Sequence, residues 1–228
     1  PSQRVRHKSK EKCFMEKCSE KSCIDCGYAN CSKMDRTFND FCMTTHMDQE
    51  VLSEAMACYA PDNPDFIIAK AAAEVESENY CKMTRVEEIM EFAKKLGFQK
   101  IGIATCVGLL GEARTAARIF RAHGFEVFGI GCKAGAVPKV SIGIPKSCEN
   151  VGVNMCNPIL QAKMLNHHHT ELNVVIGLCV GHDSLFYKYS DAIATTLITK
   201  DRVLCHNPAA ALYQAKGYYA RLMNPDNE

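Results

Sequence analysis

The chain lacks tryptophan, has almost no net charge and contains no long hydrophobic run. Its 27 Lys and Arg residues balance 26 Asp and Glu residues, and the net charge of +1 gives no basic field that would attract nucleic acid. The longest apolar run, from Val174 to Val180, is interrupted by Gly177 and is too short to span a bilayer. Basic residues punctuate the first positions, where a secretory signal would be apolar. We therefore expect a soluble, cytoplasmic chain without a nucleic-acid or membrane partner.

Two common catalytic motifs are also missing. No G-x-G-x-x-G sequence follows the first predicted strand, so the loop at Thr105-Cys106-Val107 is not a dinucleotide-binding loop. Ser184 lacks the strand–turn–helix context of a nucleophile elbow. These absences argue against an NAD-dependent dehydrogenase and against a serine hydrolase.

Cysteine is the residue that the chain has in excess. There are 14 cysteines among 228 residues, in a chain whose 47% hydrophobic and 23% charged residues are typical of a globular protein. Such a cysteine density usually signals a disulfide framework in small secreted domains. In a chain of this size without an export signal, it favours metal or cluster ligation, or redox chemistry, over structural disulfides.

The composition changes twice along the chain and divides it into three stretches. Residues 1–48 carry six cysteines and few apolar residues, which suits a metal- or cluster-binding knuckle. Residues 49–98 form a helical segment, and residues 99–228 alternate short apolar runs with helical patterns. The predicted fold is therefore α/β: a Rossmann-like, mostly parallel sheet with flanking helices, preceded by the knuckle and the helical segment.

Local signals place the individual elements. Asn63-Pro64 is a helix start, and Thr84 with Glu87 forms a capping box for a helix that ends at Gly97. Apolar runs without alternation predict four strands buried on both faces, at residues 100–105, 126–131, 173–178 and 194–199. Further helices are predicted at residues 111–123, 157–166 and 208–220, the last beginning at Asn207-Pro208.

The first group of candidate ligands lies near the N-terminus. Cys23, Cys26, Cys31 and Cys42 have the spacing C-x2-C-x4-C-x10-C, which suits tetrahedral zinc or an iron–sulfur cluster. Cys13 and Cys18 would either supplement these ligands or serve as surface or packing thiols.

The second group of candidate ligands follows the predicted strands. Cys106, Cys132 and Cys179 each end a strand, and Cys156 precedes a predicted helix. Because the carboxyl ends of parallel strands share one edge, these four thiols are expected to converge on a metal centre there. Glycines in the adjoining turns would let backbone amides approach the sulfurs, and the expected cofactor-binding residues are Gly108, Gly135, Gly181 and Asn157. The alternative is that each cysteine is a small buried hydrophobic residue.

Three polar residues near these cysteines are candidates for catalysis. His182 could donate a proton to a bound substrate with Asp183 orienting it, and Lys133 could hold an anionic ligand. Alternatively, His182 is a metal ligand, Asp183 a helix cap and Lys133 a solvated side chain. The triplet His167-His168-His169 favours a polar loop over a metal-binding site. Cys81 either is a buried thiol at a helix end or extends to the crevice at the carboxyl edge of the sheet. Cys58 and Cys205 have no companions.

Several longer stretches resemble a known family. They are residues 79–89, the run Ile101-Gly102-Ile103-Ala104 leading to Cys106, residues 155–158, 177–186, 200–204 and 206–208. In these, the chain resembles the uncharacterised metal-binding family known as domain of unknown function 1847, from about Cys23 to Leu222. The resemblance implies an N-terminal cysteine motif followed by an α/β domain whose cysteines are Cys106, Cys132, Cys156 and Cys179. Since such proteins are typical of anaerobic bacteria and archaea, it favours iron–sulfur clusters over zinc.

The expected function is that of an iron–sulfur redox protein with one or two clusters of the 4Fe–4S type. The N-terminal cluster would relay electrons from a ferredoxin-like donor, and the strand-end centre would bind or reduce a small molecule. The alternative is a zinc or soft-metal sensor, store or delivery protein without catalysis. A third possibility joins structural zinc in residues 23–42 to a thiol-dependent enzyme in the α/β domain.

Overall fold

The computed structural model describes residues 21–33 and 35–224. The chain divides into two compact units, Pro1–Phe66 and Ile67–Glu228. Cys13 and Cys18, named above as candidate supplementary ligands, lie outside the described residues.

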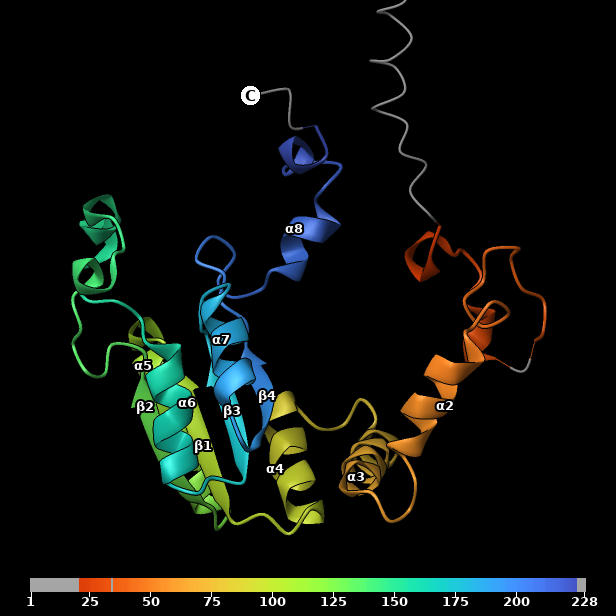
Figure 1. Ribbon diagram of the computed structural model, residues 1–228, viewed down its shortest axis with the longest axis horizontal. Coiled ribbons are helices and arrows are strands. Elements are labelled where there is room, and N and C mark those ends of the chain that lie inside the picture. Colours follow the sequence, from red (N-terminus) through yellow and green to blue (C-terminus); the bar gives the residue numbers. More distant parts are fainter. Residues whose placement is uncertain (1–20, 34, 225–228) are drawn as a thin grey trace, which may run out of the picture. The chain divides into compact units, whose positions relative to one another are not determined.

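The second unit is built around a four-stranded parallel sheet, as predicted (Figure 1). Its strands are β1 (Lys100–Thr105), β2 (Glu126–Gly131), β3 (Leu172–Ile176) and β4 (Ile193–Ile198), in the order β2-β1-β3-β4. The chain steps outward from β1 to β2 and then crosses back over β1 to reach β3. This reversal places a topological switch point between β1 and β3, where parallel sheets usually hold their ligands.

Helices cover both faces of this sheet. α6 (Pro158–His167) and α7 (His182–Tyr189) pack against each other on one face (Figure 1). α5 (Leu110–Ala122) covers the face of the sheet on which Ile103 lies. Gly102 lies on the opposite face, next to Leu165 of α6. Leu165, Leu172, Val174 and Phe186 are among the fully buried side chains that the layers share. The α/β, Rossmann-like fold class is thus confirmed.

Helix starts follow the predicted capping signals. In α4 (Arg85–Lys95), Thr84 and Glu87 form the reciprocal capping box. At the start of α3 (Pro64–Asn79), the Asn63 side chain accepts a hydrogen bond from the Asp65 amide at 3.0 Å. Each cap satisfies an amide that the first helical turn leaves without an intrahelical partner.

The unit Pro1–Phe66 has little regular structure in its described part. It contains two short 3-10 helices, Cys23–Asp25 and Asn30–Ser32, and the helix α2 (Gln49–Ala57), which Asp48 caps. No residue between 21 and 66 that the structure describes is buried. The order of this segment therefore rests on local hydrogen bonds rather than on a hydrophobic core.

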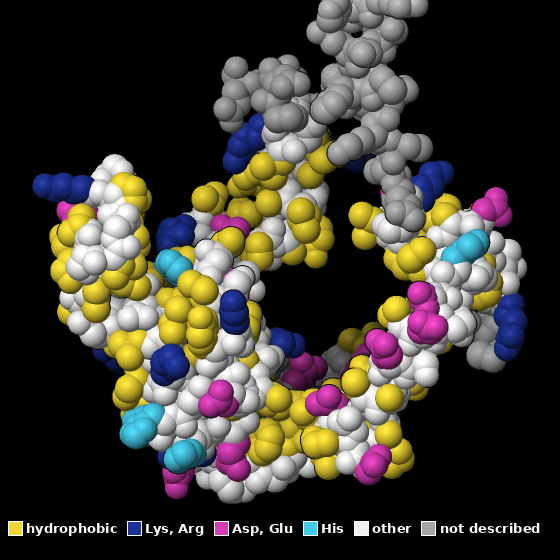
Figure 2. All heavy atoms as spheres, in the orientation of Figure 1, with side chains coloured by type: hydrophobic (Ala, Val, Ile, Leu, Met, Phe, Trp, Pro, Cys, Tyr) yellow, Lys and Arg dark blue, Asp and Glu magenta, His cyan; other side chains and the backbone are white. Residues whose placement is uncertain are grey.

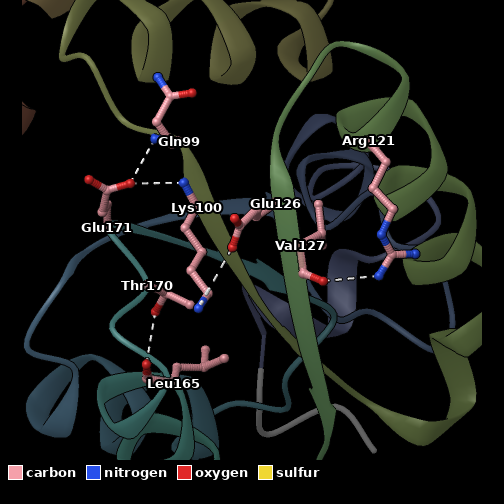
Figure 3. Close-up of polar contacts among 8 residues, drawn as sticks. All are labelled: Gln99, Lys100, Arg121, Glu126, Val127, Leu165, Thr170 and Glu171. Carbon is pink, nitrogen blue, oxygen red and sulfur yellow. Dashed lines mark hydrogen bonds and ion pairs between the residues drawn. The ribbon is translucent and has the colours of Figure 1, made fainter.

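The amino-terminal edge of the sheet is held by charged side chains (Figure 3). The Glu171 carboxylate accepts hydrogen bonds from the amides of Gln99 and Lys100 at 2.7 and 2.8 Å, which joins the entry to β3 to the start of β1. On the outer strand β2, Arg121 donates to the Val127 carbonyl at 2.9 Å. Cys106 and Cys132, which follow β1 and β2, lie at the opposite end of these strands.

The predicted end of the third strand and one predicted helix were wrong. β3 ends at Ile176 rather than at residue 178, because Gly177 has a φ of +64° and turns the chain out of the sheet. The predicted helix 208–220 is only α8 (Ala209–Tyr213), followed by turns and a 3-10 helix at Ala220–Leu222. α8 buries no residue, and its start has no side-chain cap, so no packing extends it. α7 was not predicted as an element.

A long connection leads from β2 to α6. It contains the 3-10 helices Lys139–Ile142 and Lys146–Val151, and Figure 2 shows hydrophobic side chains gathered on this projecting segment. Its base is closed by an antiparallel bridge between Pro138 and Asn154. Cys132 lies at the start of this connection and Cys156 near its end. The bridge between them therefore brings the two ends of the connection together. Within the described ranges, no helix has the length and apolarity that a membrane crossing requires.

Candidate metal centre at the carboxyl edge of the sheet

Cys106 and Cys132 are fixed by the hydrogen-bond ladder of the sheet. Cys106 directly follows β1, and its amide donates to the Ile176 carbonyl at 3.1 Å. Cys132 directly follows β2, and its amide donates to the Thr105 carbonyl at 2.8 Å. Both backbones therefore continue the regular spacing of neighbouring strands, which sets the distance between the two side chains.

Three thiols meet at this edge. Cys132 is a neighbour of both Cys106 and Cys156, each of which raises its pKa, although 24 or more residues separate it from either along the chain. Cys106 and Cys132 are buried, with 8% and 2% of their surface exposed, and Cys156 is half-buried. We call this group the thiol trio.

Backbone amides point at two sulfurs of the trio. The Val107 amide lies 3.5 Å from Cys132 Sγ, and the Gly108 amide lies 3.4 Å from Cys106 Sγ. A β-carbon added at Gly108 would stand 3.8 Å from Cys106 Sγ and 3.6 Å from Lys200 Nζ, so glycine leaves this approach open. Successive amides directed at sulfur are a common means of stabilising thiolates and metal-bound thiolates.

The thiols of the trio change one another's pKa. The hydrogen bond with Cys132 lowers the pKa of Cys106, and the Gly108 amide and Lys200 contribute in the same direction. Hydrogen bonds from Cys132 and then His182 lower the pKa of Cys156. Its two thiol neighbours and its burial raise the pKa of Cys132. The ionisation of each thiol thus depends on the other two, and a nearby cation would favour the ionisation of all three.

Cys179 lies beside an arginine rather than within the trio. Because β3 ends at Ile176, Cys179 stands three residues beyond the strand instead of directly after it. The guanidinium of Arg202 donates to its Sγ at 3.0 Å. Arg202 is also attracted electrostatically by Cys106 and Cys156, and the contact with Cys179 raises its pKa. Arg202 therefore links Cys179 to the neighbourhood of Cys106 and Cys156.

The three candidate catalytic residues occupy different positions around the trio. His182, the first residue of α7, hydrogen-bonds with Cys156, and this contact raises its pKa. Asp183 exerts a weaker electrostatic effect on His182, and its carboxylate accepts a hydrogen bond from the Ser184 amide. Lys133 donates from Nζ to the Asn154 carbonyl and acts on Cys156 and His182 electrostatically. None of the three roles proposed from the sequence is tested by these contacts.

Replacing His182 by glutamine should slow alkylation of Cys156 in the metal-free protein. The hydrogen bond from His182 helps to lower the pKa of Cys156, so its removal raises that pKa and depletes the thiolate below neutral pH. At pH values below the pKa, each unit by which the pKa of Cys156 rises lowers its thiolate fraction roughly tenfold. The rate of alkylation by iodoacetamide falls with it. Mass spectrometry of labelled peptides between pH 4 and 8 measures this rate. If the alkylation rate of Cys156 depends on pH in the same way in the variant and in the parent protein, His182 does not lower the pKa of Cys156.

The expected cofactor-binding residues other than Gly108 have local structural roles. Gly135 and Gly181 adopt φ values of +85° and +82°, which suit glycine in turns. Asn157 caps α6, since its side chain accepts a hydrogen bond from the Leu160 amide at 3.0 Å, and its own amide donates to the Cys132 carbonyl at 2.7 Å. Asn157 therefore couples the start of α6 to the trio.

Sequence reasoning missed three residues at this edge. Gln161 is fully buried, and its amide nitrogen donates to the carbonyls of Thr105 and Ile130, which joins the ends of β1 and β2 beneath the trio. Its Oε1 has no hydrogen-bond partner among the described residues. Lys200 lies 3.6 Å from Cys106 Sγ, and Arg202 contacts Cys179. Both follow β4, so the strand-end rule that identified the cysteines could also have identified them.

The four N-terminal cysteines line one small cavity. Its volume is about 110 Å³, and aromatic side chains, Phe38 and Phe41 among them, complete its wall. Asn39 donates to Cys26 Sγ at 3.4 Å, and a hydrogen bond from the Thr44 hydroxyl lowers the pKa of Cys42. The cysteines that face the cavity are Cys23, Cys26, Cys31 and Cys42. The predicted spacing motif thus brings its four thiols to a common space.

The remaining candidates lie apart from both groups. His168 stacks on Phe128 with ring centroids 3.6 Å apart, and His167 meets His168 edge-on, as packing residues do. Cys58, Cys81 and Cys205 are exposed. All twelve cysteines in the described part of the chain are free thiols. A pocket of about 1260 Å³ lies along α5 and β2, and none of these cysteines lines it.

The donor set at the carboxyl edge fits a thiophilic metal. Thiolate is the preferred ligand of zinc and of iron–sulfur clusters, and the trio combines buried sulfurs with directed amides. As they stand, no three His, Cys, Asp or Glu side chains of the described residues are arranged to hold a metal ion.

Comparison with known proteins places the chain in a family. Residues 42–197 match the family described as protein of unknown function (DUF1847), and the chain belongs to this family. An uncharacterized protein of Methanocaldococcus jannaschii is 47% identical over 156 residues, which cover 68% of this chain and 80% of the relative. The matched range is narrower than the expected span from Cys23 to Leu222. It contains Cys42 and the four strand-edge cysteines, but neither Cys23, Cys26 and Cys31 nor the loop with Lys200 and Arg202.

Proposed function

We propose that the protein is an iron–sulfur redox protein whose second unit carries a Cys-ligated centre that binds or reduces a small molecule. The observation that supports this most strongly is the thiol trio, in which Cys132 contacts Cys106 and Cys156 beneath two sulfur-directed amides. Buried thiols in contact are costly to ionise together without a cation. A metal centre with Cys106, Cys132, Cys156 and Cys179 as ligands would remove that cost and supply one-electron chemistry when bound.

The residues of the chain have defined tasks in this proposal. The amides of Val107 and Gly108 would stabilise the negative charge of the ligating sulfurs. His182, which contacts Cys156, is the group that would hold a proton for a bound substrate, and Asp183 would favour its protonated form. Lys133, at the start of the β2–α6 connection, would add positive charge on the same side.

The N-terminal cysteines would form the second centre, an electron relay. Cys23, Cys26, Cys31 and Cys42 share a cavity that aromatic side chains partly enclose, and such shielding is one of the factors that set cluster potentials. The electrons would come from a reduced ferredoxin-like protein. A cytoplasmic location is part of the proposal, because reducing compartments keep cysteines available as ligands.

Purification of the full chain without oxygen tests this function. We expect a brown protein that contains iron and acid-labile sulfide in similar amounts and loses its colour on reduction or exposure to air. Elemental analysis, sulfide determination and the visible spectrum measure these properties. A colourless protein that holds stoichiometric zinc would contradict the iron–sulfur assignment.

The second candidate function is that of a zinc or soft-metal binding protein without catalysis. It is favoured by the direct contacts of Cys132 with both neighbours, because the sulfurs around a single zinc ion also lie close together. With a Zn–S distance of about 2.3 Å, tetrahedral geometry puts sulfurs about 3.8 Å apart. Stoichiometric zinc and the absence of a redox-active signal would support this candidate.

A further inference from the structure

The loop after β4 is held by its own hydrogen bonds, and none of its residues is a proposed metal ligand. The carboxylate of Asp201 accepts hydrogen bonds from the amides of Val203 and Leu204 at 2.9 and 2.8 Å. His206 closes the loop, since its ring nitrogen accepts from the Asp201 amide at 3.1 Å and its own amide donates to the Asp201 carbonyl at 2.9 Å. We call residues 200–206 the basic loop.

This arrangement directs two positive charges toward the strand-edge cysteines. Lys200 and Arg202 flank Asp201, and their side chains reach Cys106 Sγ at 3.6 Å and Cys179 Sγ at 3.0 Å. The Asp201 carboxylate between them keeps its negative charge, but no ion pair joins it to either side chain within the described residues. The four ion pairs within residues 21–33 and 35–224 all lie elsewhere, and none of them includes Lys133, Lys200 or Arg202.

The basic side chains offset the negative charge of a loaded centre. Four thiolates around a doubly charged metal ion leave a net charge of about −2. Lys133, Lys200 and Arg202 supply three fixed positive charges near it, and Asp201 supplies one negative charge. The loaded site would therefore be close to neutral, so the centre would not repel a small anion that Arg202 holds.

Arg202 has the geometry and exposure to hold that anion. Its guanidinium has five N–H donors in a planar fork, and the contact with Cys179 uses one edge of it. Arg202 is exposed, and Val180, next to Cys179, has 91% of its surface exposed, so solvent reaches this side of the centre. A carboxylate or another small oxyanion could therefore approach and accept two hydrogen bonds.

We propose that the strand-end centre takes an anionic substrate, a small carboxylate or oxyanion, which the basic loop holds through Arg202 with Lys200 beside it. This inference rests on the proposed function, because it assumes a loaded centre at the trio. It assigns a task to the stretch from Lys200 to His206, most of which belongs to the runs that carry the family resemblance in the sequence.

Calorimetric titration of the metal-loaded full chain with acetate and with inorganic phosphate, at constant ionic strength, tests the proposal. We expect saturable binding of at least one of the two anions at one site per chain. Arg202→Gln should weaken that binding at least tenfold, and Arg202→Lys, which keeps the charge but loses the fork, should bind with intermediate affinity. Lys188→Gln on α7 is the matched control and should bind like the parent protein.

Metal and sulfide contents of the same samples separate the possible failures. A loaded centre that binds neither anion, or binds equally well in Arg202→Gln and the parent, overturns the anion proposal alone. A chain without metal at the strand-end cysteines overturns the proposed function and this inference together. Because Arg202 is an exposed loop residue, its replacement is not expected to prevent folding.

Discussion

Cys132→Ser is expected to remove the metal of the strand-end centre and leave the N-terminal centre loaded. Cys132 is the member of the trio that contacts both others, so its sulfur is closest to the middle of the ligand set. Serine keeps the size of the side chain but offers a poor ligand for zinc or iron in a sulfur site. Changes to groups that only orient ligands cost metal affinity about 10- to 100-fold, so loss of this ligand should cost more.

Metal analysis of the purified variant measures this effect, and Cys148→Ser is its matched control. Cys148 lies in the same β2–α6 connection, is exposed, and contributes its backbone carbonyl to Lys139, a contact that serine leaves intact. We expect parental metal content in the control and the loss of one centre in Cys132→Ser. Equal metal content in the two variants would mean that the trio is not a ligand set.

Gly102→Ala is expected to destabilise the α/β unit by about 3–5 kcal/mol. Gly102 is buried in β1, and an added β-carbon would stand 2.1 Å from Asn173 Oδ1 and 3.0 Å from both Leu165 Cδ1 and Thr170 Oγ1. Asn173 cannot move freely, because it is fully buried, accepts from Thr170 at 2.8 Å and donates to Ser190 at 2.8 Å. The methyl group therefore either strains the core or breaks these hydrogen bonds.

Chemical denaturation followed by circular dichroism measures this loss. Gly111→Ala serves as the control, since Gly111 lies in α5 with no atom within 4 Å of an added β-carbon. Alanine is a better helix former by up to about 1 kcal/mol, so the control should be unchanged or slightly more stable. A Gly102→Ala protein as stable as its parent would contradict the packing described between β1, β3 and α6.

The sheet could be predicted from the sequence because its strands are short apolar runs without alternation. Burial on both faces, which the sequence predicted for all four strands, holds for the central strands β1 and β3, whereas the outer strands β2 and β4 are only partly buried. β1 and β2 have the predicted bounds, and the capping box of Thr84 and Glu87 correctly located the start of α4. The proximity of Cys106 and Cys132 followed from the same reasoning, since each directly continues a strand and neighbouring parallel strands end at one edge.

Other features depend on conformations that residue patterns do not specify. The φ of +64° at Gly177 ends β3 early and moves Cys179 away from the strand end, next to Arg202. The helix expected from residue 208 stops at Tyr213, because it has no buried face to pack. Gln161 reads as an ordinary helical residue in the sequence, and only the position of α6 over the ends of β1 and β2 gives it a role.

X-ray absorption spectroscopy at the metal edge tests most directly whether the strand-edge cysteines form a metal centre. The protein for this measurement is a variant whose N-terminal cysteines have been replaced. In the full chain with all six cysteines of residues 1–48 replaced by alanine (Cys13, Cys18, Cys23, Cys26, Cys31 and Cys42), any remaining metal must be bound elsewhere. We predict that this variant retains metal whose coordination shell consists of sulfur, supplied by the strand-edge cysteines. A variant that retains no metal, or holds it mainly through nitrogen and oxygen, would show that these thiols do not form a shared metal centre.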